Sequence, residues 1–339
     1  MGASRLQRSL AGQAAVLTAG LVLSCGQPKP PVAAIADEDS PFGTRRTVLL
    51  SRPVHAESIF VVGDTFYLTE GRPEKIVSRW SMDGRELPRP LSPGSGPGEL
   101  LQAADSFLRF PDGLLGILDY RSYRVNIVEA ATARFMRSFV VSPYDIMALN
   151  GVGDPDRGLL YLFIAVQSPE VRVLDLDGLE VRPGFDYFDE LDLHPYSRFR
   201  AVLDHDGNLY YCPRSWYKVL RVTPDGEASA FAEREGGSYR RPFPIPEWTA
   251  DTGSVEKRRE WEAEHSWVRQ LAVSGDRLLV SYSVPPGFER HVVDVYDSDG
   301  RLVRGEVAAP GRLLGCEESG ECWFLADADR RRLTKVELP

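Results

Sequence analysis

The sequence is poor in the residues that commonly supply nucleophilic or metal chemistry. Its 339 residues include only 4 Cys and 5 His. The histidines are scattered, with no pair at i,i+4 spacing and no H-E-x-x-H motif, and there is no G-x-S-x-G elbow or P-loop. A Ser-His-Asp triad stays open, because its members need not be close in sequence. The sequence therefore favours a binding protein over an enzyme.

Basic residues are also fewer than acidic ones. The 40 Lys and Arg are outnumbered by 49 Asp and Glu, giving a net charge of -9, so the chain has no basic field that would attract nucleic acid. The 43% hydrophobic and 26% charged residues exclude a disordered chain, a collagen and a coiled-coil rod. We expect a globular monomer that does not bind nucleic acid.

The N-terminal apolar run is too short for a permanent membrane helix. Ala14–Leu23 has ten residues, fewer than are needed to cross ~30 Å of hydrocarbon. It follows Arg5 and Arg8, as the apolar region of an export signal follows its basic region. The run leads into Ser24 and Cys25, and Val-Leu-Ser-Cys resembles the lipobox of bacterial lipoproteins.

The lipobox resemblance implies a signal peptide over 1–24 and an acylated, palmitate-bearing Cys25 as the mature N-terminus. The alternative is an ordinary signal-peptidase site beside an unmodified cysteine. Gly26, rather than Asp, follows the cysteine, which in Gram-negative lipoproteins implies the outer membrane, facing either the periplasm or the surface. Residues 25–44 are rich in Pro, Ala and acids and read as a flexible tether. The membrane would then be a partner through lipid alone.

Export places the other cysteines in an oxidising compartment. Cys316 and Cys322 flank a turn-like stretch between two short expected strands, an arrangement that brings two side chains to disulfide distance. We predict that they are bridged. Cys212 would then be a single thiol in a strand, buried and inert rather than catalytic.

Turn signals recur along the chain with one period. Gly or Asp precedes an apolar strand near residues 64, 113, 158, 207, 275 and 320, at spacings of 49, 45, 49, 68 and 45 residues. A second series of turns, mostly Asp-Gly, follows alternating strands at residues 83, 131, 177, 225 and 299. Both series lengthen between residues 226 and 275, so one insertion explains both.

A period of 45–49 residues with about four strands is typical of a propeller blade. We predict an all-β fold over residues 45–339, a six-bladed β-propeller of four-stranded antiparallel blades. The last blade lacks its outer strand, which residues 46–51 are free to supply, and this closure leaves no exposed edge. A β-sandwich with irregular turns is the alternative. The expected blades are 57–92, 102–141, 144–188, 197–233, 265–309 and 311–339.

One loop carries a family resemblance. The stretch Gly94–Leu100, Gly-Ser-Gly-Pro-Gly-Glu-Leu, resembles the G-x-G-P-G-E-[FL] loop between the first blades of six-bladed, NHL-like propeller lipoproteins of bacteria. The resemblance covers about residues 45–339 and implies fold and envelope location, without indicating a chemistry.

Strand direction divides the connections between two faces. Turns 1–2 and 3–4 of each blade lie on one face, here the turn face, and connectors 2–3 and 4–1 lie on the opposite one, the connector face. Irregular loops and the insertion at 234–264 belong to the connector face, where loops can carry binding. The insertion is either a plug of the channel or a lid over a ligand. The expected partner-binding residues are Glu99, Tyr120, Arg121, Arg214, Trp216, Arg240 and Trp248.

Charged residues stand near the starts of all six innermost strands. Three consecutive blades offer acids and the next three offer arginines, so the channel mouth would suit a zwitterionic or dipolar ligand, or the charges pair with one another. The register of these strands decides which face each side chain takes. The six residues are Glu57, Asp105, Asp145, Arg200, Arg269 and Arg312.

Three functions are consistent with these patterns. The first is a lipid-anchored, non-catalytic binding module for a small molecule or an envelope protein, without a cofactor. The second is a metal-dependent hydrolase similar to lactonase-like propellers, in which Glu57, Asp105 and Asp145 would hold Ca²⁺ or Mg²⁺. The arginines oppose this, because they repel a cation. The third is a purely structural member of an envelope complex.

Overall fold

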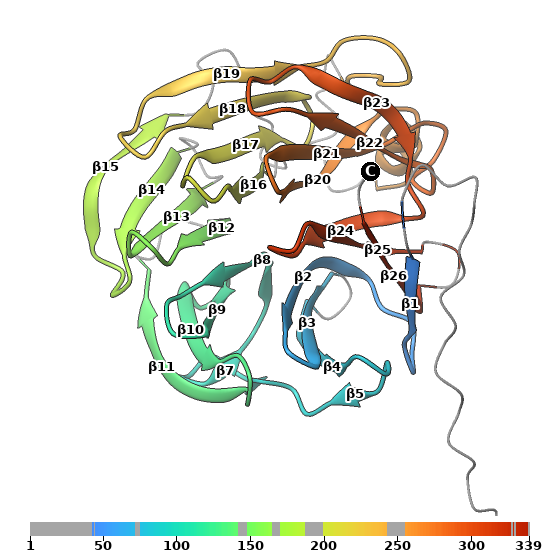
Figure 1. Ribbon diagram of the computed structural model, residues 1–339. Helices are drawn as coiled ribbons and strands as arrows, with labels where there is room; N and C mark the ends of the chain where they lie inside the picture. Colours follow the sequence, from blue (N-terminus) through green and yellow to red (C-terminus); the bar gives the residue numbers. More distant parts are fainter. Residues whose placement is uncertain are drawn as a thin grey trace, which may run out of the picture. The chain divides into compact units, whose positions relative to one another are not determined.

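Six four-stranded antiparallel sheets form a ring, as the computed structural model shows (Figure 1). The structure describes residues 43, 45–71, 75–141, 148–164, 170–186, 199–242, 255–326, 328 and 330–337. They belong to one unit, Val32–Pro339. The innermost strands β2, β8, β12, β16, β20 and β24 each contact the innermost strand of the next blade, and β24 contacts β2. The predicted six-bladed propeller is therefore confirmed.

The blades follow one another along the chain. Blade 1 consists of β2 (Ala56–Val62), β3 (Thr65–Glu70), β4 (Val77–Ser81) and β5 (Glu86–Leu87). Blade 2 consists of β8 (Ala103–Arg109), β9 (Leu114–Asp119), β10 (Arg124–Glu129) and β11 (Arg134–Val140). Blade 3 consists of β12 (Ala148–Asp154), β13 (Leu159–Ile164), β14 (Glu170–Asp175) and β15 (Glu180–Asp186).

The second half of the ring repeats this order. Blade 4 consists of β16 (Phe199–Leu203), β17 (Leu209–Pro213), β18 (Lys218–Val222) and β19 (Ala228–Glu233). Blade 5 consists of β20 (Trp267–Ser274), β21 (Arg277–Ser283), β22 (His291–Tyr296) and β23 (Leu302–Ala308). Blade 6 consists of β24 (Arg312–Cys316), β25 (Glu321–Leu325), β26 (Arg332–Glu337) and β1 (Arg45–Leu49). A short parallel pair, β6 (Ser92–Pro93) and β7 (Glu99–Leu100), joins blades 1 and 2.

The N-terminal strand closes the ring as predicted. β1 pairs antiparallel with β26, with Val48 opposite Leu333, and both side chains are buried. The chain then runs into blade 1, where the Ser51 amide donates to the Gly84 carbonyl oxygen at 2.9 Å. The first and last blades are thus joined by hydrogen bonds and by a shared apolar core.

The Asp-Gly turns work by backbone conformation. Gly84 and Gly300 have φ of +82° and +78°, a region that side chains with a Cβ rarely enter. A Cβ on Gly84 would stand 2.0 Å from the Leu49 carbonyl oxygen, so this turn also needs glycine for space. The turn residues that defined the repeat are therefore required by local geometry.

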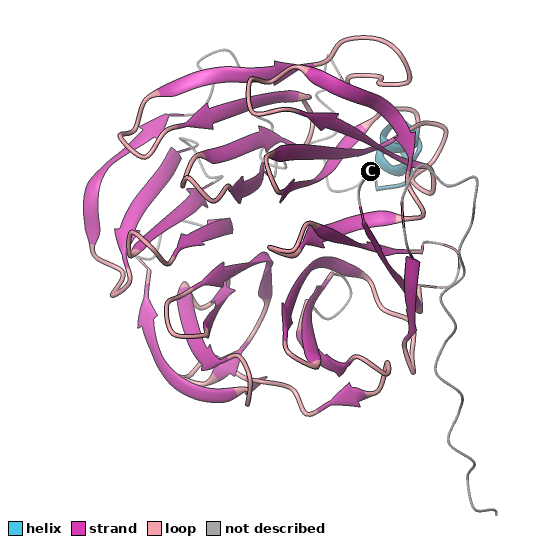
Figure 2. Cartoon of the chain, viewed as in Figure 1, coloured by secondary structure: helices cyan, strands magenta, loops and turns pink. Residues whose placement is uncertain are grey.

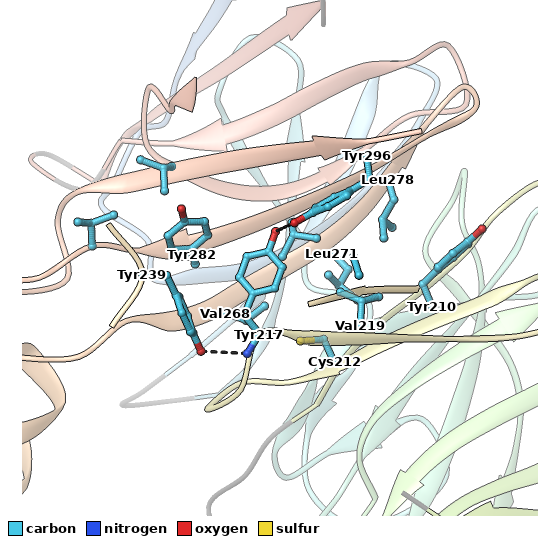
Figure 3. Close-up of a cluster of buried hydrophobic side chains, with 14 residues drawn as sticks. Tyr210, Cys212, Tyr217, Val219, Tyr239, Val268, Leu271, Leu278, Tyr282 and Tyr296 are labelled. Carbon is cyan, nitrogen blue, oxygen red and sulfur yellow. Dashed lines mark hydrogen bonds between the residues drawn. The ribbon is translucent and has the colours of Figure 1, made fainter. Parts of the chain in front are cut away.

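Apolar clusters fill the spaces between neighbouring blades. Figure 3 shows the cluster between blades 4 and 5, where the rings of Tyr217, Tyr239 and Tyr282 meet edge to face at 5.5–5.6 Å. The Tyr239 hydroxyl accepts a hydrogen bond from the Tyr217 amide at 2.9 Å. Because Tyr239 belongs to the insertion, this contact fixes the start of the insertion to the propeller.

The cysteines follow the predictions that the described residues test. Cys316 and Cys322 form a disulfide between adjacent strands of blade 6. Cys212 is a buried free thiol in β17, and burial raises its pKa well above the ordinary value. The predictions for 1–24, Cys25 and the rest of the tether fall outside the described residues.

The insertion contributes the only helix among the described residues, α1 (Val255–Ala263), drawn in cyan in Figure 2. The Trp261 ring packs edge to face on Trp267 of β20, with ring centroids 5.7 Å apart. The Trp267 Nε1–H donates to the Glu262 carbonyl oxygen at 2.8 Å. The helix is therefore attached to blade 5. This helix is too short to cross a membrane, so the described part of the chain contains no helix that could span one.

Candidate functional site

Five of the six predicted channel residues come from the starts of innermost strands. Glu57 lies in β2, Asp105 in β8, Arg200 in β16, Arg269 in β20 and Arg312 in β24. Asp145 lies outside the described residues. The strands belong to blades 1, 2, 4, 5 and 6, so residues up to 255 positions apart converge near the channel axis.

The charges pair across the channel. Arg200 Nη2 lies 3.1 Å from Glu57 Oε2, and Arg200 Nη1 lies 3.6 Å from Asp105 Oδ2. Arg312 Nη1 lies 3.2 Å from Glu57 Oε1. Glu57 thus connects blade 1 to blades 4 and 6. We call Glu57, Asp105, Arg200, Arg269 and Arg312, together with Arg214, the charge cluster.

Backbone irregularities determine which of these residues leave the regular register. In β2 the pairing passes from Ala56 to Ser58 and leaves Glu57 as an extra residue. In β20 it passes from Val268 to Gln270 and leaves Arg269 in the same position. In β8 the irregularity covers the three residues around Asp105. A β-bulge re-aims a side chain that a regular strand would place on a sheet face.

Arg214 joins the cluster from outside the innermost strands. It lies in the connector between β17 and β18, and its carbonyl oxygen accepts the Val268 amide at 2.9 Å. Its guanidinium lies 5.7 Å from the Trp267 ring centroid and acts electrostatically on Glu57 and Arg269. From the sequence, Arg214 was expected to be a partner-binding loop residue of the connector face, and no sequence signal indicated this contact.

Glu57 is held as a carboxylate. Burial raises its pKa, but Arg312, Arg200, Arg214 and Arg269 together outweigh burial and lower the pKa from 4.5 to about 2. The four guanidiniums therefore share one carboxylate as their common counter-charge. Asp105 is the second acid of the cluster and is buried.

A cavity of about 900 Å³ extends along the innermost strands of all six blades. Its walls near the charge cluster include Ser58, Ser106 and Gln270, which follow Glu57, Asp105 and Arg269 directly in sequence. The Gly151 amide donates to Ser106 Oγ at 3.0 Å, and Gln270 Nε2 donates to the Leu314 carbonyl oxygen at 2.9 Å. These bonds join adjacent blades around the cavity.

The other end of the cavity reaches the 1–2 turns and is acidic. Its rim combines six carboxylates with two arginines and one histidine. Arg109 and Glu318 form an ion pair at 2.7 Å from blade 2 to blade 6, and Arg157 pairs with Asp154 at 3.2 Å. The rim is exposed at His205 and Glu318, so the cavity opens on the turn face. The rim residues are Arg109, Asp154, Asp156, Arg157, Asp204, His205, Asp276, Glu317 and Glu318.

This opening differs from the expectation that binding belongs to the connector face. The turn face contains the mouth of the cavity, which is surrounded by the 1–2 turns. The difference has a packing reason: Ser106, Gly151 and Ala201 on the innermost strands are small and leave space between the strands.

The predicted partner-binding residues of the connector face divide into buried and exposed ones. Tyr120 is buried and its hydroxyl accepts a hydrogen bond from Lys75 Nζ at 2.7 Å. Trp216 is buried beneath Arg241 and Lys218, whose charged groups lie 4.2 and 4.7 Å from its ring. Of the others, Arg214 is half-buried, Arg121 and Arg240 are exposed, and Trp248 lies outside the described residues.

Glu99 of the Gly94–Leu100 loop serves the loop itself. Its carboxylate accepts the Gly96 amide at 2.8 Å, and Asn126 Nδ2 donates to its carbonyl oxygen at 2.9 Å. The loop motif is therefore a structural connection between blades 1 and 2. The distinction between plug and lid for the insertion turns on its middle section, which is not among the described residues.

The charge cluster does not fit a divalent cation. The Glu57 carboxylate already lies against Arg200 and Arg312, and four guanidiniums around it would repel a metal ion. No group of three potential ligands lies close enough to hold a metal within the described ranges. The residues present therefore give no support to the metal-dependent hydrolase.

Comparison with known proteins identifies the fold. The sequence matches no protein-family model and no curated protein. The structure resembles a DUF4221 family member from Bacteroides vulgatus, with a TM-score of 0.56 and 10% identity over 87% of this chain and 96% of that one.

Two further structures give similar scores. A Bacteroides fragilis protein described as exported has a TM-score of 0.57 and 12% identity, covering 87% of this chain and 95% of that one. The WD40 repeats of RRP9 have a TM-score of 0.55 and 11% identity, covering 91% and 99%. Identities this low show a shared fold alone, and that fold is the β-propeller.

Proposed function

We propose that this protein is a non-catalytic binding module of the cell envelope, anchored through a lipid on Cys25, that takes a small dipolar ligand into its central channel. The observation that carries the proposal is the cavity of about 900 Å³. Small-molecule sites in proteins have volumes of about 300–1,000 Å³.

The charge distribution supports a dipolar ligand. Carboxylates outnumber basic residues at the open rim. In the charge cluster four arginines outnumber two carboxylates, and Arg269 directly precedes Gln270, which lines the cavity. A molecule with a cationic group toward the rim and an anionic group toward the arginines would be attracted at both ends. A protein partner on the connector face has less support, because Glu99, Tyr120 and Trp216 are engaged inside the fold.

The channel proposal is tested by blocking the cavity. Ala201 lines the cavity from β16 and is half-buried, so Ala201→Trp would fill it and Ala201→Ser is the matched control. Native mass spectrometry of protein purified from the envelope should show a bound small molecule with wild type and Ala201→Ser. Equal retention by a folded Ala201→Trp variant would contradict the channel proposal.

The anchor is tested separately. Cys25→Ala should move the protein from the membrane fraction to the soluble fraction and abolish incorporation of labelled palmitate. A Cys25→Ala variant that stays in the membrane fraction would contradict lipid anchoring. Cys212→Ala, which changes a buried thiol, is the control for an effect of losing a cysteine.

A further inference from the structure

Arg269 differs from the other arginines of the charge cluster. Arg200 and Arg312 each form an ion pair with Glu57. Arg269 forms none within 4 Å among the described residues, although only 7% of its surface is exposed. Its Nε and Nη2 atoms are buried and have no hydrogen-bond partner in the described part of the chain. A buried guanidinium normally has its N–H groups bonded, because leaving them unmet is unfavourable.

The two unmet nitrogens have a specific geometry. Nε and Nη2 lie on the same edge of a guanidinium, so their N–H groups point the same way. This edge is the fork that binds the two oxygens of a carboxylate side by side. The unmet donors therefore match a planar anion with two acceptor oxygens.

The guanidinium is held in place without using these donors. Its central carbon lies 4.9 Å from the centroid of the Phe288 ring, a cation–π contact. Phe288 belongs to the connector between β21 and β22, and the neighbouring Gly287 amide donates to the Ala263 carbonyl oxygen of α1 at 2.7 Å. The bulge in β20 aims Arg269 away from the sheet face, and the ring supports it from one side.

The surroundings carry surplus positive charge. Burial lowers the pKa of Arg269 well below its ordinary value, and Arg214 and Arg312 beside it lower it further. Glu57 opposes them but already pairs with two other arginines. Glu57 and Arg312 have side chains that are 23% and 21% exposed, so solvent reaches the cluster.

We propose that the Nε/Nη2 edge of Arg269 is a binding site for a carboxylate group of the ligand, with Arg312 and Arg214 adding positive charge. This inference deepens the proposed function, on which it rests, because it assigns the anionic end of the dipolar ligand. The bound carboxylate would accept both unmet N–H groups and supply the missing counter-charge.

The test uses acetate as the probe, acetamide as its uncharged analogue, and the mature protein at constant ionic strength in NaCl. Titration calorimetry should show saturable acetate binding and no acetamide binding by wild type. Arg269→Lys keeps the charge but lacks the fork, so it should weaken acetate binding by tenfold or more. Arg137→Lys, a change on the outer strand β11 and outside the cavity lining, is the matched control and should bind acetate as wild type does.

A second measurement, made on wild-type protein, keeps the inference testable if Arg269→Lys does not fold. In wild-type protein the ¹⁵Nε–H signal of Arg269, assigned by its loss in Arg269→Lys or Arg269→Gln, should shift on adding acetate and stay in place on adding acetamide. No acetate binding, or equal binding by Arg269→Lys, would overturn the inference. Binding of inorganic phosphate without acetate would also overturn the assignment to a carboxylate.

The two proposals fail in different ways. Failure of the channel function appears as equal ligand retention by Ala201→Trp, whatever acetate does. Failure of the inference appears as unchanged acetate binding by Arg269→Lys, while Ala201→Trp still loses the ligand.

Discussion

The Glu57→Gln substitution should destabilise the protein strongly because Glu57 is the shared counter-charge of four arginines. The fall of its pKa from 4.5 to about 2 corresponds to about 3 kcal/mol of unfolding free energy at about 1.4 kcal/mol per pH unit. Its side chain is 23% exposed, so the arginines act in a partly desolvated site. The variant should lose about 3 kcal/mol at pH 7, which lowers Tm by roughly 5 °C for a domain of this size.

The pH dependence gives the sign of the effect. Because the pKa is lower in the folded state, the stabilisation is complete above pH 4.5 and is lost as pH falls towards 2. The difference between wild type and Glu57→Gln should therefore shrink to about half by pH 3. Urea unfolding at pH 7, 4.5 and 3 measures it.

The control is Glu318→Gln, which removes an exposed carboxylate paired with Arg109 and should change Tm by less than about 2 °C. A loss below about 1 kcal/mol at pH 7 for Glu57→Gln would refute the reasoning. So would a difference between the two proteins that stays constant from pH 7 to pH 3.

Three further predictions concern the rest of the fold. Replacing both Cys316 and Cys322 by Ala, which opens a link of sequence separation 6, should lower the free energy of unfolding by about 2 kcal/mol; a Tm unchanged by the replacement and by reductant would contradict this. Cys212 is buried with a raised pKa, so Ellman's reagent should find no reactive thiol in native protein lacking residues 1–25 and one in denaturant; rapid native labelling would show that blade 4 opens. Asp294 is fully buried against Arg234, the Tyr217 hydroxyl and the Glu306 amide, so Asp294→Asn should lose about 3 kcal/mol in urea unfolding, whereas exposed Asp299→Asn should lose almost nothing.

The ring was predictable because its turns obey local rules. Gly84 and Gly300 take the positive φ that their turns require, and such positions are visible in sequence as Asp-Gly pairs. One insertion lengthened both turn series at the same place, and this agreement distinguishes a repeat from coincidence. The outer strand missing from blade 6 then pointed to residues 46–51, and β1 fills this place.

The site was predictable in composition but not in geometry. Charges at the starts of innermost strands are visible in sequence, yet the bulges that aim Glu57 and Arg269 depend on cross-strand pairing and have no local signature. Arg200 reaches the same cluster from a strand with regular pairing. Arg214 arrives from a loop, and the position of the cavity depends on how side chains pack.

The charge cluster combines a structural part and a part that the fold does not need. Arg200 and Arg312 link blades 4 and 6 to blade 1 through Glu57, so removing either breaks a partly buried ion pair between blades and should destabilise the ring. Arg269 makes no such link to any residue that the structure describes, and its charge is repelled by Arg214 and Arg312.

Removing the surplus charge should therefore stabilise the protein while abolishing binding. Arg269→Met retains an unbranched apolar side chain against Phe288 and should raise the unfolding free energy without acetate by about 1–2 kcal/mol. Arg312→Met should lower it. Acetate should raise the Tm of wild type and leave that of Arg269→Met unchanged. If Arg269→Met is instead destabilised as much as Arg312→Met, Arg269 is a structural member of the cluster, because a residue kept for a ligand is one whose loss the empty protein tolerates.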